Sequence, residues 1–76
     1  MQKTQITLGS VQAVRDFVQQ VILLNYEVDL VQGRYIVDAK SIMGIFALDT
    51  LAPIEVVAHT DDAREFFAKI DCFIVK

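Results

Sequence analysis

The stretch DAKSIMGIFALD, residues 38–49, contains the strongest local signal in the chain. Ser41 stands directly before a run in which Ile42, Ile45 and Phe46 recur at intervals of three and four, which is the spacing of one helix face. Serine is a preferred N-cap, because its hydroxyl oxygen accepts a hydrogen bond from a free amide of the first turn. The stretch therefore predicts a short helix of about two turns that begins after Ser41 and is interrupted by Gly44.

The N-terminal third predicts a strand followed by a helix. Thr4, Ile6 and Leu8 alternate with polar residues, as in a strand with one buried face. After Gly9, apolar residues recur at helical spacing up to about residue 24, with polar residues on the opposite side. Ser10 is the predicted N-cap of this first helix.

Two further strands, YEVDL (26–30) and RYIVDA (34–39), flank a predicted hairpin turn at Gly33, which can adopt the positive φ that such a turn requires. The alternation predicts that Tyr26, Val28 and Leu30 face the helices, while the intervening acidic residues face water. The segment IEVVAH (54–59) predicts a fourth strand, and its residues with inward-facing side chains are Ile54, Val56 and Ala58.

A last helix is predicted after Thr60, its expected N-cap, with Asp61, Asp62 and Glu65 in the first turn, where the helix dipole favours acidic side chains. One side of this helix carries the apolar residues Ala63, Phe66, Phe67, Ile70 and, if the helix extends that far, Phe73. The final segment CFIVK (72–76) has strand composition, so an edge strand remains an alternative to a longer helix.

The order of elements predicts an α+β fold. A four-stranded, mainly antiparallel sheet with the three helices on one face, and water on the other, accommodates strand, helix, strand, strand, short helix, strand and helix. The chain has 76 residues, no linker and no repeats, which predicts one domain over residues 1–76. Its apolar fraction of 54% suits a core of aliphatic and phenylalanine side chains.

Composition excludes several classes of function. A net charge of −3 with scattered lysines and arginines argues against nucleic-acid binding, and no apolar run is long enough for a membrane span. One cysteine allows no internal disulfide, and the first ten residues lack the apolar block of a signal peptide, so a cytoplasmic location is expected. Cys72 is expected to be a buried or half-buried apolar residue. The HTDD segment (59–62) brings three potential ligands too close together to predict a metal site, and no cofactor is expected.

At DAKSIMGIFALD the sequence resembles the HPr family, the small phosphocarrier proteins of the bacterial sugar phosphotransferase system, in the type that carries a Lys-Ser-Ile-Met-Gly segment. The order of elements along the rest of the chain is similar as well. The resemblance implies an open-faced β-sandwich.

Carrier members of that family have a second motif at the head of the first helix, in which a histidine accepts a phosphoryl group and an arginine and a proline follow. Counted back without a gap from Phe17, the histidine's place falls on Ser10, the arginine's on Gln12 and the proline's on Ala13. A serine has no imidazole nitrogen and is a weak nucleophile without an adjacent base. The resemblance therefore points to the HPr homologues of catabolite repression, which lack the histidine.

In that branch a kinase phosphorylates the serine of Lys-Ser-Ile-Met-Gly, and here the corresponding residue is Ser41. The resemblance implies a non-enzymatic regulatory or adaptor protein, monomeric or weakly dimeric. Its expected partners are an HPr-type kinase and a transcriptional regulator or transporter component. The partner-binding residues it implies lie at the heads of the first and short helices: Ser10, Gln12, Lys40, Ile42, Met43 and Phe46.

Two alternatives remain open at the level of sequence. The same surface could bind partners without any phosphorylation, in which case Ser41 is a helix cap only. The chain could also carry phosphate on its single histidine, His59, although that residue has no counterpart as a phosphoryl acceptor in the family.

Overall fold

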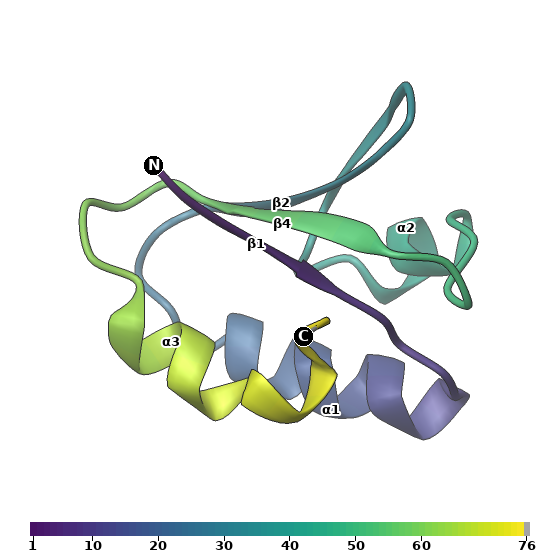
Figure 1. Ribbon diagram of the computed structural model, residues 1–76, viewed down its shortest axis with the longest axis horizontal. Coiled ribbons are helices and arrows are strands. Elements are labelled where there is room, and N and C mark those ends of the chain that lie inside the picture. Colours follow the sequence, from purple (N-terminus) through teal and green to yellow (C-terminus); the bar gives the residue numbers. More distant parts are fainter. Residues whose placement is uncertain (76) are drawn as a thin grey trace.

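The computed structural model describes residues 1–75 and contains one four-stranded sheet in which every neighbouring pair of strands is antiparallel (Figure 1). The strand order is β1-β4-β2-β3. The strands are β1 (Gln2–Ile6), β2 (Val28–Gln32), β3 (Tyr35–Asp38) and β4 (Ile54–Ala58), and the helices are α1 (Val11–Val21), α2 (Ile42–Phe46) and α3 (Arg64–Lys69), followed by a 3₁₀ turn (Asp71–Phe73).

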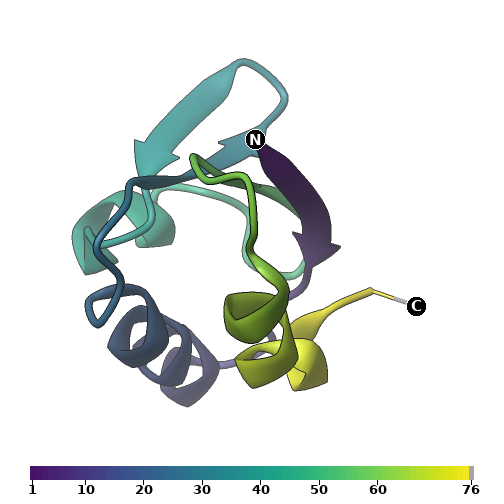
Figure 2. The same cartoon turned by 90° about the vertical axis from the view of Figure 1, so that its left-hand side faces the viewer.

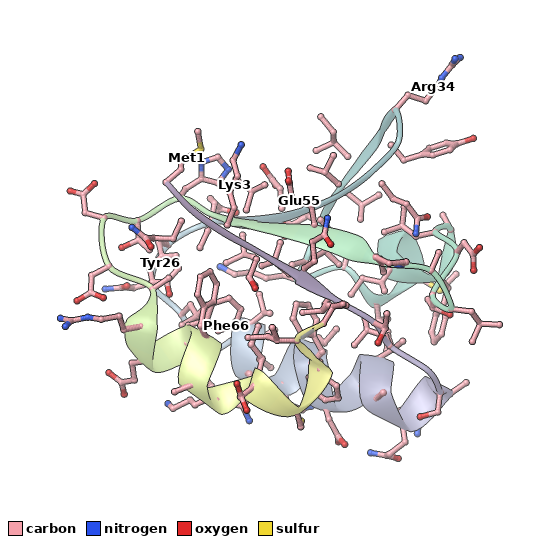
Figure 3. All side chains as sticks on the ribbon, in the orientation of Figure 1. Met1, Lys3, Tyr26, Arg34, Glu55 and Phe66 are labelled. Atoms are coloured by element: carbon pink, nitrogen blue, oxygen red, sulfur yellow. The ribbon has the colours of Figure 1, made fainter. Side chains whose placement is uncertain are left out.

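Helices α1 and α3 run beneath one face of the sheet, and α2 lies at the end of the molecule where α1 begins (Figures 1 and 2). The opposite face carries no helix. There, Lys3 of β1 and Glu55 of β4 point away from the helical layer, whereas Phe66 points between the layers (Figure 3). The α+β open-faced sandwich predicted from the sequence is confirmed.

The core lies between the sheet and the helices and contains no buried polar or charged residue within residues 1–75. Phe17 of α1 is fully buried, and its ring centroid lies 6.3 Å from that of Phe66 in α3 and 6.4 Å from that of Phe73. These contacts join α1, α3 and the C-terminal turn. The other main core residues are Ile6, Leu8, Val14, Val21, Val28, Leu30, Ile45, Ile54, Val56, Ala58, Ala63 and Ile70.

The β2–β3 hairpin has a two-residue turn, because Gln32 pairs directly with Tyr35. Gly33 adopts a φ of 60° and Arg34 does not have a positive φ, which fits a type II′ turn with glycine at its first central position. The predicted role of Gly33 is therefore confirmed. Val28 and Leu30 face the helices as predicted, and both are fully buried.

Three boundaries differ from those predicted. Helix α1 ends at Val21 rather than near residue 24, and the amide of Leu24 closes the turn by donating to the carbonyl of Val21 at 3.0 Å. Strand β2 begins at Val28, so Tyr26 lies in the connection before it, half-buried against the core. Strand β1 ends at Ile6, although Leu8 is still fully buried.

The predicted start of the last helix is wrong. Helix α3 begins at Arg64, its N-cap position is Ala63, and no side chain caps it there. Thr60 instead accepts from the amide of Asp62 at 3.3 Å, and Asp62 Oδ1 accepts from the amide of Arg64 at 3.1 Å. These two side-chain acceptors hold a turn before the helix, so Asp61 and Asp62 lie outside it and Glu65 is the acidic residue of its first turn.

The C-terminal segment, predicted as either a longer helix or an edge strand, contains a short helical turn and then a single strand-like bridge. Residues 71–73 form the 3₁₀ turn, after which Ile74 forms an isolated antiparallel bridge with Ile6 of β1. Lys76 lies outside the described residues. The expectation for Cys72 is wrong, because its side chain is exposed. The turn directs its neighbour Phe73 inward against Phe17 and leaves Cys72 outside.

We expect Gly33→Ala to lower the free energy of unfolding by about 1 to 3 kcal/mol, because an L side chain is strained at a positive φ. Gly9→Ala is the matched control, since its φ is outside the left-handed region and an added methyl group would meet nothing within 4 Å. It should change the stability by less than about 1 kcal/mol. Urea denaturation of both variants measures the difference, and equal effects would contradict the turn assignment.

Candidate functional site

Ser10 caps helix α1. Its backbone is extended, with φ −154° and ψ 164°, and its Oγ accepts a hydrogen bond from the amide of Ala13 at 3.0 Å. Two positions into the helix, the side-chain amide of Gln12 donates to Asp16 Oδ1 at 2.8 Å, one turn further along. The hydroxyl of Ser10 is therefore engaged with the helix backbone, and the Gln12 side chain extends away from the helix start.

Within residues 1–75, no basic side chain forms a hydrogen bond with Ser10. The chain's single histidine, His59, follows β4, and its Nε2 lies 2.8 Å from Asp29 Oδ2. Because Ala58 pairs with Gln2, His59 is next to the first residue of β1, whereas Ser10 follows the last residue of that strand. The structure thus separates the two residues by the length of β1.

Ser41 caps α2 in the same way, with its Oγ accepting from the amide of Gly44 at 3.1 Å. The serine is exposed. Next to it, Met43 is 77% exposed and Phe46 is 44% exposed, whereas Ile42 is half-buried and packs against the core. The start of α2 therefore combines the exposed Ser41 with the accessible Met43, while the accessible Phe46 is the last residue of the same short helix.

Gly44 has a packing role that sequence reasoning missed. A Cβ at this position would lie 3.3 Å from Ser41 Oγ and 3.3 Å from the Cβ of Val37 in β3. Such contacts are tight, so glycine allows α2 to approach β3 closely while the Ser41 cap stays in place. The glycine that interrupts the helical pattern in the sequence thus marks a close approach rather than a break.

Asp38 positions the loop that leads into α2. Its Oδ1 accepts from the amide of Lys40 at 2.9 Å, and its carbonyl accepts from the amide of Ser41 at 3.0 Å. Lys40 is half-buried, and its ammonium group forms no ion pair with any of residues 1–75. The residue directly before Ser41 thus carries a positive charge, and the Asp38 carboxylate in the same loop binds its backbone amide rather than its ammonium group.

The two capped helices lie at the same end of the molecule (Figure 1), and α1 contacts α2. Val11, the first residue of α1, is 56% exposed there. We call this end, defined by Ser10, Val11, Ser41, Met43 and Phe46, the capped-helix surface. Of the site residues predicted from the sequence, this surface includes Ser10, Ser41, Met43 and Phe46, and the structure adds Val11 to them.

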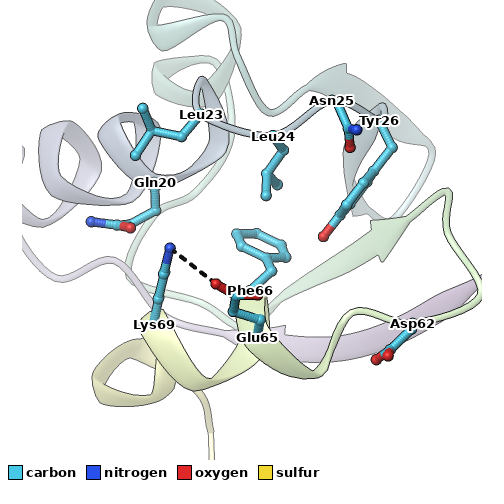
Figure 4. Close-up of a pocket in the computed structure, with 9 residues that line it drawn as sticks. All are labelled: Gln20, Leu23, Leu24, Asn25, Tyr26, Asp62, Glu65, Phe66 and Lys69. Carbon is cyan, nitrogen blue, oxygen red and sulfur yellow. Dashed lines mark ion pairs between the residues drawn. The ribbon is translucent and has the colours of Figure 1, made fainter.

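A pocket of about 370 Å³ lies away from this surface, between the C-terminal end of α1 and helix α3 (Figure 4). The side chains of Leu24, Tyr26 and Phe66 point into it. Burial, then the charges of Asp62 and Glu65, raise the pKa of the Tyr26 phenol. Sequence reasoning did not find this pocket, because two segments far apart in the chain, residues 20–26 and residues 62–69, supply its walls.

The acidic side of the pocket is already paired. Arg64 donates to both carboxylate oxygens of Asp62, at 2.9 and 2.8 Å, and Glu65 lies 3.7 Å from the Lys69 ammonium.

Among residues 1–75 no group of three histidine, cysteine or acidic residues could hold a metal ion. Likewise, none of the helices in that range has the length and apolar character needed to cross a membrane.

Comparison with solved structures identifies the architecture. The HPr protein of Thermoanaerobacter tengcongensis superposes with a TM-score of 0.79 at 23% identity, over 95% of this chain and 89% of that one. The phosphocarrier protein HPr of Bacillus anthracis gives 0.69 at 25% identity, over 97% and 94%. The chain has the HPr fold. No protein-family model and no curated protein sequence matches the chain.

A third neighbour with the HPr fold is Crh of Bacillus subtilis, described as a catabolite repression protein that forms a domain-swapped dimer. It superposes with a TM-score of 0.66 at 25% identity, over 93% of this chain and 88% of that chain. The structural relatives thus include both phosphocarrier proteins and a catabolite repression protein.

We expect Ser41→Ala to lower the free energy of unfolding by about 1 kcal/mol, because it removes the acceptor for the Gly44 amide. Ser41→Asp, which keeps an acceptor at the N-cap position, should retain most of the stability. Thermal or urea denaturation compares the two. Equal losses of stability in Ser41→Ala and Ser41→Asp would contradict a stabilising role for the hydrogen bond to the Gly44 amide.

Hydrogen bonds from the Arg64 side chain, and next from its backbone amide, lower the pKa of Asp62 from 3.8 to about 2. A lowered carboxyl pKa stabilises the fold above the unfolded value, and this contribution disappears as the pH falls through about 2. Arg64→Ala should therefore raise the pKa of Asp62 toward 3.8, as measured by NMR titration of its carboxyl carbon. An unchanged pKa would contradict the role of Arg64.

Proposed function

We propose that the chain is an HPr-like regulatory or adaptor protein that binds other proteins through the capped-helix surface, is phosphorylated on Ser41, and does not relay phosphoryl groups through a histidine. The HPr fold of its neighbours, one of them a catabolite repression protein, supports the general assignment. The observation that carries the proposal is the exposed Ser41 hydroxyl at the start of α2, beside Lys40 and the accessible Met43.

The chemistry at Ser10 supports the loss of relay activity. Its hydroxyl caps α1, and the side chain has no histidine or carboxylate partner within residues 1–75. A serine activated by neither a base nor a lowered pKa is a poor nucleophile. Moreover, a phosphoserine lacks the labile P–N bond through which a phosphohistidine transfers its phosphoryl group.

The surroundings of Ser41 favour a phosphate. Phosphorylation would add about 1.5 to 2 negative charges and three acceptor oxygens at a helix start, where backbone amides are available. The amide of Gly44, now bound to Ser41 Oγ at 3.1 Å, is one such donor. Lys40, the residue before Ser41, adds a positive charge that forms no ion pair among residues 1–75.

Phosphorylation would act on partner choice through charge rather than through refolding. Met43 and Phe46 are exposed and apolar, and Val11 adds to the same end of the molecule. A dianionic group beside them favours a partner with both an apolar and a cationic surface, and disfavours one that is purely apolar or acidic. We expect this partner to be a transcriptional regulator or a transporter component, and an HPr-type kinase would supply the phosphate.

Incubation with an HPr-type kinase and ATP, followed by mass spectrometry, tests the phosphorylation. We expect one phosphate on Ser41 in the native chain and in Ser10→Ala, which has lost the other helix cap, and none in Ser41→Ala. Absence of phosphate from Ser41, with an authentic HPr protein labelled in parallel, would overturn this part of the proposal.

The phosphorylation-independent alternative rests on the same exposed side chains. In that case Ser41→Ala would still bind the regulator with unchanged affinity, whereas Phe46→Asp would not, because it places a charge in an apolar contact. Calorimetric titration of both variants against the regulator, with circular dichroism to check the fold, separates the two mechanisms.

A further inference from the structure

The outer edge of β3 is open among residues 1–75, whereas the opposite edge of the sheet is covered at the C-terminal end of β1. At β1, the amide of Thr7 donates to the carbonyl of Phe73 at 2.9 Å and the amide of Val75 donates to that of Gln5 at 2.8 Å. In the part of the chain that the structure describes, β3 pairs with β2 alone, and the hairpin extends beyond the helices (Figures 1 and 2). An uncovered edge strand is a template for pairing with another chain.

The hairpin register determines which backbone groups point outward. Gln32 and Tyr35 close a two-residue turn, so they form a hydrogen-bonded pair, and the pattern alternates along the strand. The amide of Ala39, which donates to the carbonyl of Val28 at 2.9 Å, fits this alternation. The N–H and C=O of Ile36, and the N–H of Asp38, therefore point away from β2.

The side chains at this edge are apolar and accessible. Tyr35 is 61% exposed and Ile36 is 68% exposed, although both lie within a strand. Ile36 pairs with Val31, which follows the buried Leu30. Because side chains alternate along a strand, Val31 and Ile36 both lie on the open face of the sheet.

Asp38 and Arg34 carry opposite charges at this edge, but neither has an ion-pair partner in its own chain among residues 1–75. Asp38 lies directly opposite Asp29 on β2, an arrangement that like charges destabilise. Asp29 has His59 at 2.8 Å, but no cationic side chain within residues 1–75 pairs with Asp38. Arg34, which extends from the hairpin tip in Figure 3, has no ion-pair partner in the same range.

Two copies of an antiparallel edge can pair about a two-fold axis in a few registers, and charge selects one of them. A pair centred on Ile36 places Arg34 of each copy opposite Asp38 of the other. A pair centred on Val37 would bring Arg34 opposite Lys40, which are like charges. A pair centred on Tyr35 would place Arg34 opposite Ile36 and leave Asp38 unpaired.

We propose that the chain forms a symmetric dimer in which the β3 edges pair antiparallel about Ile36. Ile36 exchanges both backbone hydrogen bonds with Ile36 of the second copy, and each Asp38 carboxylate meets Arg34 of the other copy. The two sheets become one continuous sheet. This contact differs from a domain swap, because no element leaves its own copy, and it does not rest on the proposed function.

Sedimentation equilibrium from micromolar to millimolar protein tests the charge contact. The native mass should rise from the monomer's 8.6 kDa toward twice that value. Arg34→Asp and Asp38→Arg should each weaken dimerisation at least about tenfold, which corresponds to about 1.4 kcal/mol. An equimolar mixture of the two variants should restore it, because each then supplies the charge that the other lacks.

Arg15→Asp, which changes the net charge equally on α1, is the control and should leave dimerisation unchanged. A native chain that stays monomeric at millimolar concentration would overturn the proposal. So would a dimer that is insensitive to Arg34→Asp, which is the behaviour expected of a strand-swapped dimer.

Crosslinking tests the register independently. In a Cys72→Ser background, Ile36→Cys should form a disulfide-linked dimer under mild oxidation, because the two Cα atoms of a hydrogen-bonded pair lie about 5.5 Å apart, within disulfide range. Ala68→Cys, an exposed position on α3, is the control and should crosslink at least tenfold more slowly. Equal rates at both positions would contradict the register.

Discussion

The burial of Phe17 between the helices and the sheet is the interaction on which the rest of the structure depends. Its fully buried ring contacts Phe66 of α3 and Phe73 of the C-terminal turn, with centroids 6.3 and 6.4 Å away. Both long helices are thereby held on one face of the sheet, and the last residues are brought to the free edge of β1. The same arrangement leaves the other face of the sheet bare and places the start of α1 next to α2.

The two proposed interaction surfaces, the capped-helix surface and the edge of β3, lie outside the hydrophobic core. At one end, Ser10 and Ser41 each use their hydroxyl to cap a helix, so both helix starts are ordered yet accessible. At the edge of the sheet, the hairpin that contains Ile36 extends beyond the helical layer (Figure 1). The backbone N–H and C=O of Ile36 point away from β2 and form no hydrogen bond with it. Ser41 is thus proposed as a site of covalent control, and β3 as a site of self-association, on neighbouring but separate elements.

The sequence predicted those features that depend on local chemistry. The two serine caps and the turn at Gly33 follow from the preferences of single residues, and the inward faces of β2 and β4 follow from alternation. Features that depend on distant contacts were missed or wrong. Gly44 leaves room for Val37 of another element, and Cys72 is turned outward because Phe73 turns inward. The start of α3 is later than predicted, and the side chains of Thr60 and Asp62 bind amides in the turn before it. The pocket and the open β3 edge need the strand order, which no local pattern encodes.

The central claim is that the HPr fold is kept here while its phosphohistidine chemistry is absent. Incubation with phosphoenolpyruvate and enzyme I of the sugar phosphotransferase system, with the phosphate carrying a radiolabel, tests this most directly. The account predicts no acid-labile, base-stable label on the chain, because Ser10 offers a capping hydroxyl in place of an imidazole and His59 is paired with Asp29 at the other end of β1. Stoichiometric label of that kind on His59 would contradict it.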